Sequence, residues 1–193
     1  MTATTLPSIP ATDETWLRLV RIGAGLATLG LVVLGASSTF WTTSGEGDFK
    51  YAADYWLTAA ALPIGVGMIL HAYGVHRLHH TRDGRLGTAG LGLFAACSAV
   101  IIIQCMCSVA SGAELRWGPA YPLCAVGSFV GLALVAAASW RVGVVPRWML
   151  GVWPPLMLVG SWAGQSVLPG VFAVFLIASG VVLGQRVGSA PPA

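Results

Sequence analysis

The chain has 193 residues, of which 56% are hydrophobic and 9% are charged, and its formal net charge is +3. Soluble domains carry about 25% charged residues, so this composition excludes an ordinary soluble domain and indicates an integral membrane protein. Lysine occurs once and asparagine is absent. Because both residues use AT-rich codons, we expect a GC-rich bacterial genome and a location in the plasma (inner) membrane.

The two ends of the chain have the composition of disordered tails. The N-terminal stretch MTATTLPSIPATDET contains two prolines and two acidic residues and lacks the basic start of a signal peptide. We expect residues 1–15 and 188–193 to be cytoplasmic tails. Residues 16–187 are predicted to form one transmembrane domain.

Six apolar windows follow in chain order, near residues 17–40, 55–76, 86–112, 119–140, 147–165 and 167–186. A helix needs about 20 such residues to cross about 30 Å of hydrocarbon. Only the segment SVLPG separates the last two windows, and we interpret it as a tight turn. The predicted fold class is all-α, a polytopic integral membrane protein built as a bundle of six transmembrane helices.

The positive charges are distributed asymmetrically between the two sides of such a bundle. With six spans, eight of the nine arginines fall on the side that holds the termini, whereas the other side has Arg116 and Lys50. Arginine and lysine accumulate on the cytoplasmic side of membrane proteins, so both termini are predicted to be cytoplasmic. Every tryptophan except Trp153 falls near the end of a predicted span, where its ring favours the membrane interface.

Small residues four positions apart recur in the spans and allow helices to approach closely. The pairs are Gly127 with Gly131, Gly160 with Gly164, and Gly180 with Gly184. Since the chain contains 25 glycines, chance alone also produces such pairs. We therefore treat these glycines as candidate helix-packing positions.

Prolines within the second and fifth spans are predicted to kink them, because proline cannot donate a helical hydrogen bond. They are Pro63, Pro154 and Pro155. Their matching places in two halves of three spans resemble the interrupted helices of transporters with inverted repeats. The local similarity between WLTAAALP and WMLGVWPP is short, and we interpret it as coincidence.

All four histidines lie in the stretch HAYGVHRLHH, and three of them, His76, His79 and His80, would share one helical face. Imidazole is a common metal ligand, so these three are a candidate metal site. The H-x-x-H-H spacing resembles one histidine box of the membrane di-iron desaturases and hydroxylases. Those enzymes draw on several boxes, and this chain has none outside residues 71–80, so a di-iron centre of that kind is excluded within one chain.

The histidine segment also has a simpler interpretation. It runs into a loop with Arg77, Arg82 and Arg85, and these positive charges disfavour a divalent cation nearby. Asp83 stands between two of the arginines. We therefore interpret the segment as a solvated basic loop that helps to set topology and contacts anionic headgroups. His71, two turns earlier, is expected to be a buried packing residue.

The cysteines suggest one covalent link. Cys105 and Cys107 lie near the outer end of the third span, and Cys124 lies near the outer start of the fourth. Because the connecting turn is short, a disulfide between Cys107 and Cys124 is a candidate on the non-cytoplasmic side, and Cys105 is an alternative partner. The C-M-C triplet offers soft ligands suited to Cu(I), but no second such cluster accompanies it.

No sequence motif identifies a reaction. The chain contains no P-loop, G-x-S-x-G, H-E-x-x-H or dinucleotide fingerprint, and no ionisable residue lies at mid-depth in the predicted spans. No cofactor is implied, and nucleic-acid binding has no support. The sequence favours a non-catalytic accessory membrane subunit, with the lipid bilayer and either a membrane protein or a second copy as partners.

Two alternatives remain from the sequence. Kinks in the second and fifth spans favour a small permease or exporter of a neutral or lipophilic solute. The face formed by His76, His79 and His80 favours a membrane enzyme with a metal site at the cytoplasmic rim.

Overall fold

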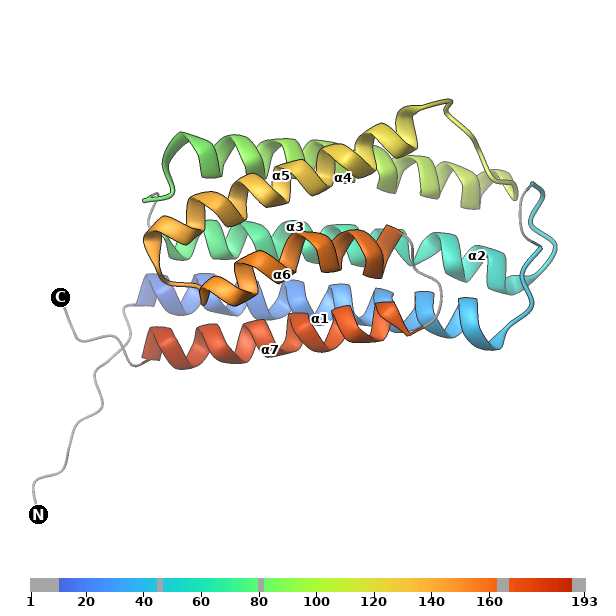
Figure 1. The fold of residues 1–193 in the computed structure, drawn as a ribbon. Helices are drawn as coiled ribbons and strands as arrows, with labels where there is room; N and C mark the ends of the chain where they lie inside the picture. The colour runs from blue at the N-terminus through green and yellow to red at the C-terminus, as the bar shows by residue number, and fades with distance from the viewer. Residues whose placement is uncertain (1–10, 45–46, 80–81, 163–166, 189–193) are drawn as a thin grey trace, which may run out of the picture.

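The described residues form a bundle of helices (Figure 1). The computed structural model describes residues 11–44, 47–79, 82–162 and 167–188, and within these ranges it contains no strand beyond one isolated bridge. The prediction of an all-α fold is therefore confirmed. The elements are α1 (Ala11–Phe40), α2 (Ala52–Ala59), α3 (Ala61–Leu78), α4 (Gly84–Ser111), α5 (Ala120–Val142), α6 (Arg147–Met157), the π-helix η1 (Leu158–Trp162) and α7 (Leu168–Gly188).

Five helical segments are long and apolar enough to cross a membrane, and each matches one predicted span. They are Asp13–Phe40, Ala52–Leu78, Gly84–Ser111, Ala120–Val142 and Leu168–Arg186. The remaining predicted span, 147–165, corresponds to α6 and η1, which have 11 and five residues. Together they reach about 24 Å at 1.5 Å per residue, less than the thickness of a hydrocarbon core. Residues 163–165 of that span lie outside the described residues.

Prolines divide two of the helical passes. Pro63 has no N–H to offer the carbonyl of Ala59, four residues earlier, and the pass is split there into α2 and α3. Pro154 and Pro155 lie inside α6, which continues into the π-helix η1 at Leu158. Both irregular regions therefore follow from local sequence.

Two helix pairs approach through glycine. On α1, a Cβ added to Gly23 would lie 2.5 Å from the backbone nitrogen of His71 on α3. On α5, a Cβ added to Gly131 would lie 2.5 Å from the backbone nitrogen of Phe94 on α4. Only a residue without a side chain permits these separations, so the register of each pair is fixed by glycine.

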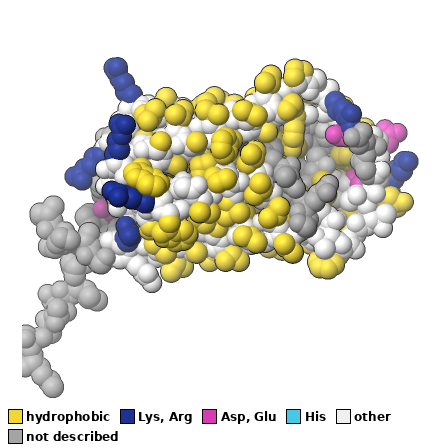
Figure 2. Space-filling model, viewed as in Figure 1, with side chains coloured by type: hydrophobic (Ala, Val, Ile, Leu, Met, Phe, Trp, Pro, Cys, Tyr) yellow, Lys and Arg dark blue, Asp and Glu magenta, His cyan; other side chains and the backbone are white. Residues whose placement is uncertain are grey.

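The two ends of the bundle differ in charge. Figure 1 shows that α1 begins and α7 ends at the same end, here called the terminal end. Most lysine and arginine side chains in view gather there, whereas acidic side chains gather mainly at the opposite, distal end (Figure 2). The flank between them is largely hydrophobic. It includes exposed Leu29, Val126, Val174 and Ile177, as expected of helices that face lipid.

Candidate functional site

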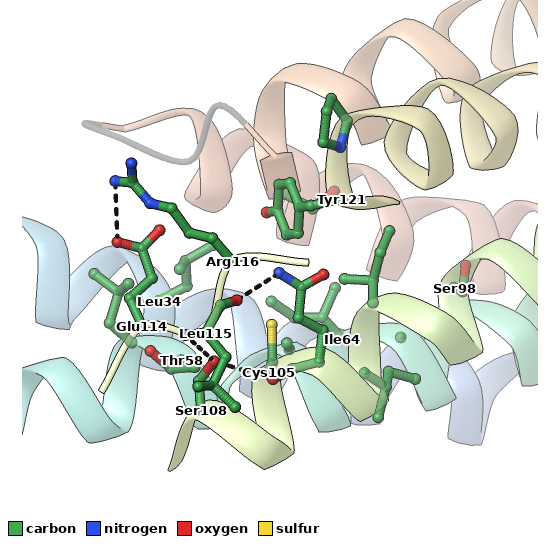
Figure 3. Close-up of a pocket in the computed structure, with 18 of the residues that line it drawn as sticks. Leu34, Thr58, Ile64, Ser98, Cys105, Ser108, Glu114, Leu115, Arg116 and Tyr121 are labelled. Carbon is green, nitrogen blue, oxygen red and sulfur yellow. Dashed lines mark hydrogen bonds and ion pairs between the residues drawn. The ribbon is translucent and has the colours of Figure 1, made fainter. Parts of the chain in front are cut away.

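A cavity of about 820 Å³ extends from the distal end into the middle of the bundle (Figure 3). Its lining includes Ser98 of α4, which lies 13 residues before Ser111 at the helix end. This spacing corresponds to a depth of about 20 Å at 1.5 Å per residue. The volume falls within the range of about 300–1,000 Å³ that is usual for small-molecule sites.

Both proline-divided passes border this cavity. The α2–α3 junction contributes Thr58, Ala61 and Ile64, and the α6–η1 junction contributes Met157 and Ser161. Proline and π-helical turns kink a helix, and a kinked helix packs less closely against its neighbours. The cavity therefore lies where two irregular passes face each other.

The deep part of the cavity is apolar, and its charges lie at the distal mouth. Large apolar side chains line the inner wall, among them Ile64, Met68, Phe94, Ile101 and Met157. The ionised side chains in the lining are Asp54, Glu114 and Arg116. Figure 3 shows Glu114 and Arg116 turned toward each other, and their charged groups are 3.5 Å apart.

Asp54 is buried, but its carboxylate is used by the chain itself. It accepts hydrogen bonds from the backbone nitrogens of Ser44, Lys50 and Tyr51 at 2.8–3.0 Å and from the Ser44 hydroxyl at 2.8 Å. These bonds satisfy the charge locally and anchor the segment that follows α1. Asp54 is therefore a structural clamp at the mouth.

Gln104 is the polar residue of the cavity wall with the clearest hydrogen-bonding signature. It is 7% exposed, and its Nε2 donates to the carbonyl of Leu115 at 2.8 Å. A carbonyl can only accept, so this bond fixes the orientation of the amide. Oε1 of Gln104 is buried and has no hydrogen-bond partner among the described residues.

The described part of the histidine segment, residues 71–79, is largely buried, which corrects its interpretation as a solvated loop. His76, His79 and Asp83 are 6%, 1% and 7% exposed. Oδ2 of Asp83 lies 2.6 Å from Nδ1 of His76 and 3.6 Å from Nδ1 of His79, which also lies 3.4 Å from Oγ of Ser139. Asp83, the residue before α4, is therefore enclosed, while its neighbours Arg82 and Arg85 stay exposed.

The predicted metal site at His76, His79 and His80 stays a prediction, since His80 lies outside the described residues. Within the described residues, no group of three or more His, Cys, Asp or Glu side chains is arranged to hold a metal ion. His76 is instead hydrogen-bonded to Asp83, a neighbour that the sequence analysis placed in solvent.

His71 is buried between helices and hydrogen-bonded. Its Nδ1 lies 3.1 Å from the carbonyl of Val20, and its Nε2 lies 3.3 Å from the hydroxyl of Ser179. The ring also makes an edge contact with Trp153. Because Val20 can only accept, Nδ1 carries the proton in the neutral ring and Nε2 faces the serine. This histidine ties α3 to α1 and α7.

The four cysteines are free thiols. The thiol of Cys97 lies within hydrogen-bonding reach of Cys124, and it would touch a Cβ added to Gly127. The connection between α4 and α5 spans residues 112–119. With this connection, Cys124 in the first turns of α5 faces Cys97 of α4. The predicted disulfide between Cys107 and Cys124 is not formed in this structure.

The remaining predicted packing positions have varied surroundings. A Cβ on Gly160 would lie 2.6 Å from Cβ of Phe172 on α7, and one on Gly180 would lie 3.6 Å from the Arg21 side chain. Gly184 also faces Arg21. Gly164 lies outside the described residues. The α7 glycines therefore make room for an arginine side chain of α1.

The chain matches no model of a protein family, no curated protein and no solved structure. Its candidate function is therefore argued from the geometry of the chain itself.

Proposed function

We propose that this small membrane protein binds an uncharged, mostly apolar small molecule in the distal cavity and acts as its permease or exporter. The observation that carries the proposal is the cavity of about 820 Å³, which reaches the middle of the bundle between two proline-divided passes. Interrupted helices that border a central site are typical of transporters.

The chemistry of the wall supports an uncharged ligand. Below the mouth, the described lining residues are apolar or neutral polar, such as Phe94, Ser98 and Gln104. A charged ligand at this depth would need a compensating charge. Apolar walls with a few hydrogen-bonding groups are typical of sites for lipophilic molecules.

The role of accessory subunit, which the sequence favoured, now ranks second. It does not require an internal cavity, and a bundle that only supports a partner is expected to be filled by its own side chains. Isolation of a stoichiometric partner protein would favour the accessory subunit over the permease or exporter.

Native mass spectrometry of the purified protein tests the proposed function. We expect a bound small molecule to accompany the wild type and to be lost in Ser98→Phe, because the added ring would occupy the deep cavity. Val126→Phe is the matched control, since Val126 is 59% exposed on the bundle surface. Absence of any bound molecule in the wild type, or its retention in Ser98→Phe, would count against the proposal.

The orientation of the bundle is proposed from the arginine distribution, with both termini cytoplasmic in a plasma membrane. A green fluorescent protein fused to the C-terminus should fluoresce, and alkaline phosphatase fused after Trp117 should be active. The opposite pattern would place the distal mouth in the cytoplasm and reverse the direction from which the cavity is reached.

A further inference from the structure

The loop Ala113–Trp117, between α4 and α5, lies across the distal mouth of the cavity. Glu114, Leu115 and Arg116 belong to the cavity lining. Figure 3 shows Leu115 between Glu114 and the helix that carries Ser108 and Cys105. The loop therefore forms part of the wall of the cavity at its distal mouth.

Glycines bound the loop on both sides. Gly112 has a φ of 69° and Gly118 has a φ of 54°, and both values lie in the left-handed region that residues with a side chain rarely adopt. Glycine positions of this kind can absorb a change in backbone direction. The loop consequently has at each end a glycine whose backbone can change direction.

Two side chains of α4 hold the backbone of Leu115. Nε2 of Gln104 donates to its carbonyl at 2.8 Å, and Oγ of Ser108 accepts from its N–H at 3.0 Å. The Ser108 hydroxyl in turn donates to the carbonyl of Gln104 at 3.0 Å. These bonds form a latch of Gln104 and Ser108 on one residue of the loop.

The other side of the loop is paired with the segment that follows α1. Asp48 and Ala113 form an antiparallel bridge, flanked by bonds from Phe49 N to Gly112 O at 2.8 Å and from Glu114 N to Gly47 O at 2.9 Å. Neither bridge residue bonds directly to the other in this pattern, which brings their Cα atoms to about 4.5 Å. Asp54 anchors the segment just after it, at Lys50 and Tyr51.

The latch has unused hydrogen-bonding capacity. Oε1 of Gln104 is buried without a partner among the described residues. If the loop moves away, Nε2 of Gln104 loses its acceptor in a mostly apolar site, and Oγ of Ser108 loses the N–H of Leu115 while it still donates to the carbonyl of Gln104. A ligand that carries a neutral donor and acceptor would satisfy these groups, and its binding would therefore favour the open state.

We propose that the loop Ala113–Trp117 is the gate of the distal cavity, and that Gln104 and Ser108 bind the polar group of an uncharged amphiphile once Leu115 has left them. This inference rests on the proposed function, because it names the entrance and the polar subsite of the same cavity. The apolar part of the amphiphile lies against the deep wall, near Met68 and Phe94.

The gate can be tested through the thiol of Cys105, which lines the cavity beneath Leu115. Cys97, Cys107 and Cys124 are replaced by alanine, and the protein is placed in nanodiscs, where both faces are accessible. Modification of Cys105 by a charged methanethiosulfonate, 2-(trimethylammonium)ethyl methanethiosulfonate, is followed by peptide mass spectrometry. The charged reagent does not enter through lipid, so its rate reports access through the mouth.

Asp48→Cys with Ala113→Cys locks the gate, because their Cα separation suits a disulfide. We expect the reagent to modify Cys105 about tenfold more slowly in the oxidised form than in the reduced form. In the double variant Gln104→Leu with Ser108→Ala, we expect modification of Cys105 to be about tenfold faster than in its parent, because the loop loses two hydrogen bonds. As a control, a chain whose only native cysteine is Cys107, which is outside the cavity lining, should be modified at Cys107 at the same rate in each background. Equal Cys105 rates in the locked and unlocked forms overturn the gate.

The polar subsite is tested with two uncharged probes in the same assay. Dodecanoylglycerol carries hydroxyl groups, and methyl dodecanoate has the same acyl chain without them. We expect dodecanoylglycerol to protect Cys105 more strongly in the wild-type background, and the difference to vanish in Gln104→Leu. Equal protection by the two probes before that substitution overturns the subsite.

The two proposals fail in different ways. In the first case, the wild type retains a bound molecule that is lost in Ser98→Phe, but oxidation of the disulfide does not change the rate of Cys105 modification. This result overturns the gate and leaves the proposed function standing. A protein whose Cys105 rate follows the disulfide, but which binds no molecule in the cavity, supports the gate and contradicts the proposed function.

Discussion

The carboxylate of Asp83 lies 2.6 Å from Nδ1 of His76, and both side chains are buried at the terminal end of the bundle. The bond joins the last turn of α3 to the residue before α4. It therefore holds the end of α3 against the start of α4. The opposite ends of both helices line the cavity.

Removal of Asp83 should destabilise the bundle. We expect Asp83→Ala to lower the free energy of unfolding by about 2 kcal/mol, because it leaves the buried Nδ1 of His76 without its hydrogen-bond partner. Chemical denaturation in mixed micelles measures this change. Arg85→Ala is the control, since Arg85 is exposed in the first turn of the same helix, and an equal loss in both variants would contradict the structural role of Asp83.

The carboxylate of Asp83 competes with any metal ion for His76, one of the three predicted ligands His76, His79 and His80. An ion would have to displace or share the bond between His76 and Asp83. We therefore expect protein dialysed against Zn²⁺ and then freed of excess metal to retain well under one ion per chain. Retention of a full equivalent that is lost in the alanine variant of all three histidines would instead establish the metal site.

Close packing of α1 on α3 predicts a sharp difference between two glycines on α1. A Cβ at Gly23 would lie 2.5 Å from the backbone of α3, whereas nothing lies within 4 Å of one at Gly25. Gly23→Ala should lower the free energy of unfolding by about 2 kcal/mol through overpacking. Gly25→Ala should leave it unchanged or raise it slightly, because alanine favours helix. Thermal unfolding of the two variants makes the comparison, and similar midpoints would show that the helices are not packed so closely.

Sequence patterns were sufficient for the elements whose determinants are local. Long apolar runs located the five helices that are long enough to span a membrane, since length and hydropathy alone decide that property. Proline chemistry placed the interruptions near Pro63 and Pro154. Burial of Asp83 was missed because an acidic residue between two arginines looks solvated in sequence. Its enclosure depends on its contacts with His76 and His79, which form only in the folded chain.

The cavity could not be predicted for a related reason. Its wall combines residues as distant as Leu34, Ile64, Ser98 and Met157, which become neighbours only through helix packing. One sequence signal could have pointed to it, because Gln104 is an uncharged polar residue within the predicted span 86–112. A polar residue in such a place often faces a site between helices.

The register of α4 against α5 predicts which cysteines can be cross-linked. A short turn between the third and fourth spans favoured a link from Cys124 to Cys107, with Cys105 as the alternative. The connection occupies residues 112–119, and the thiol of Cys124 lies within hydrogen-bonding reach of Cys97. In double-cysteine variants, mild oxidation should link Cys97 to Cys124 faster than Cys107 to Cys124, because a disulfide requires Cα atoms within about 7 Å. Mass spectrometry of the cleaved protein identifies the linked peptides. Preferential linkage of Cys107 to Cys124 would shift α5 along α4 and move Tyr121 away from the cavity mouth, which would also remove the basis for the gate.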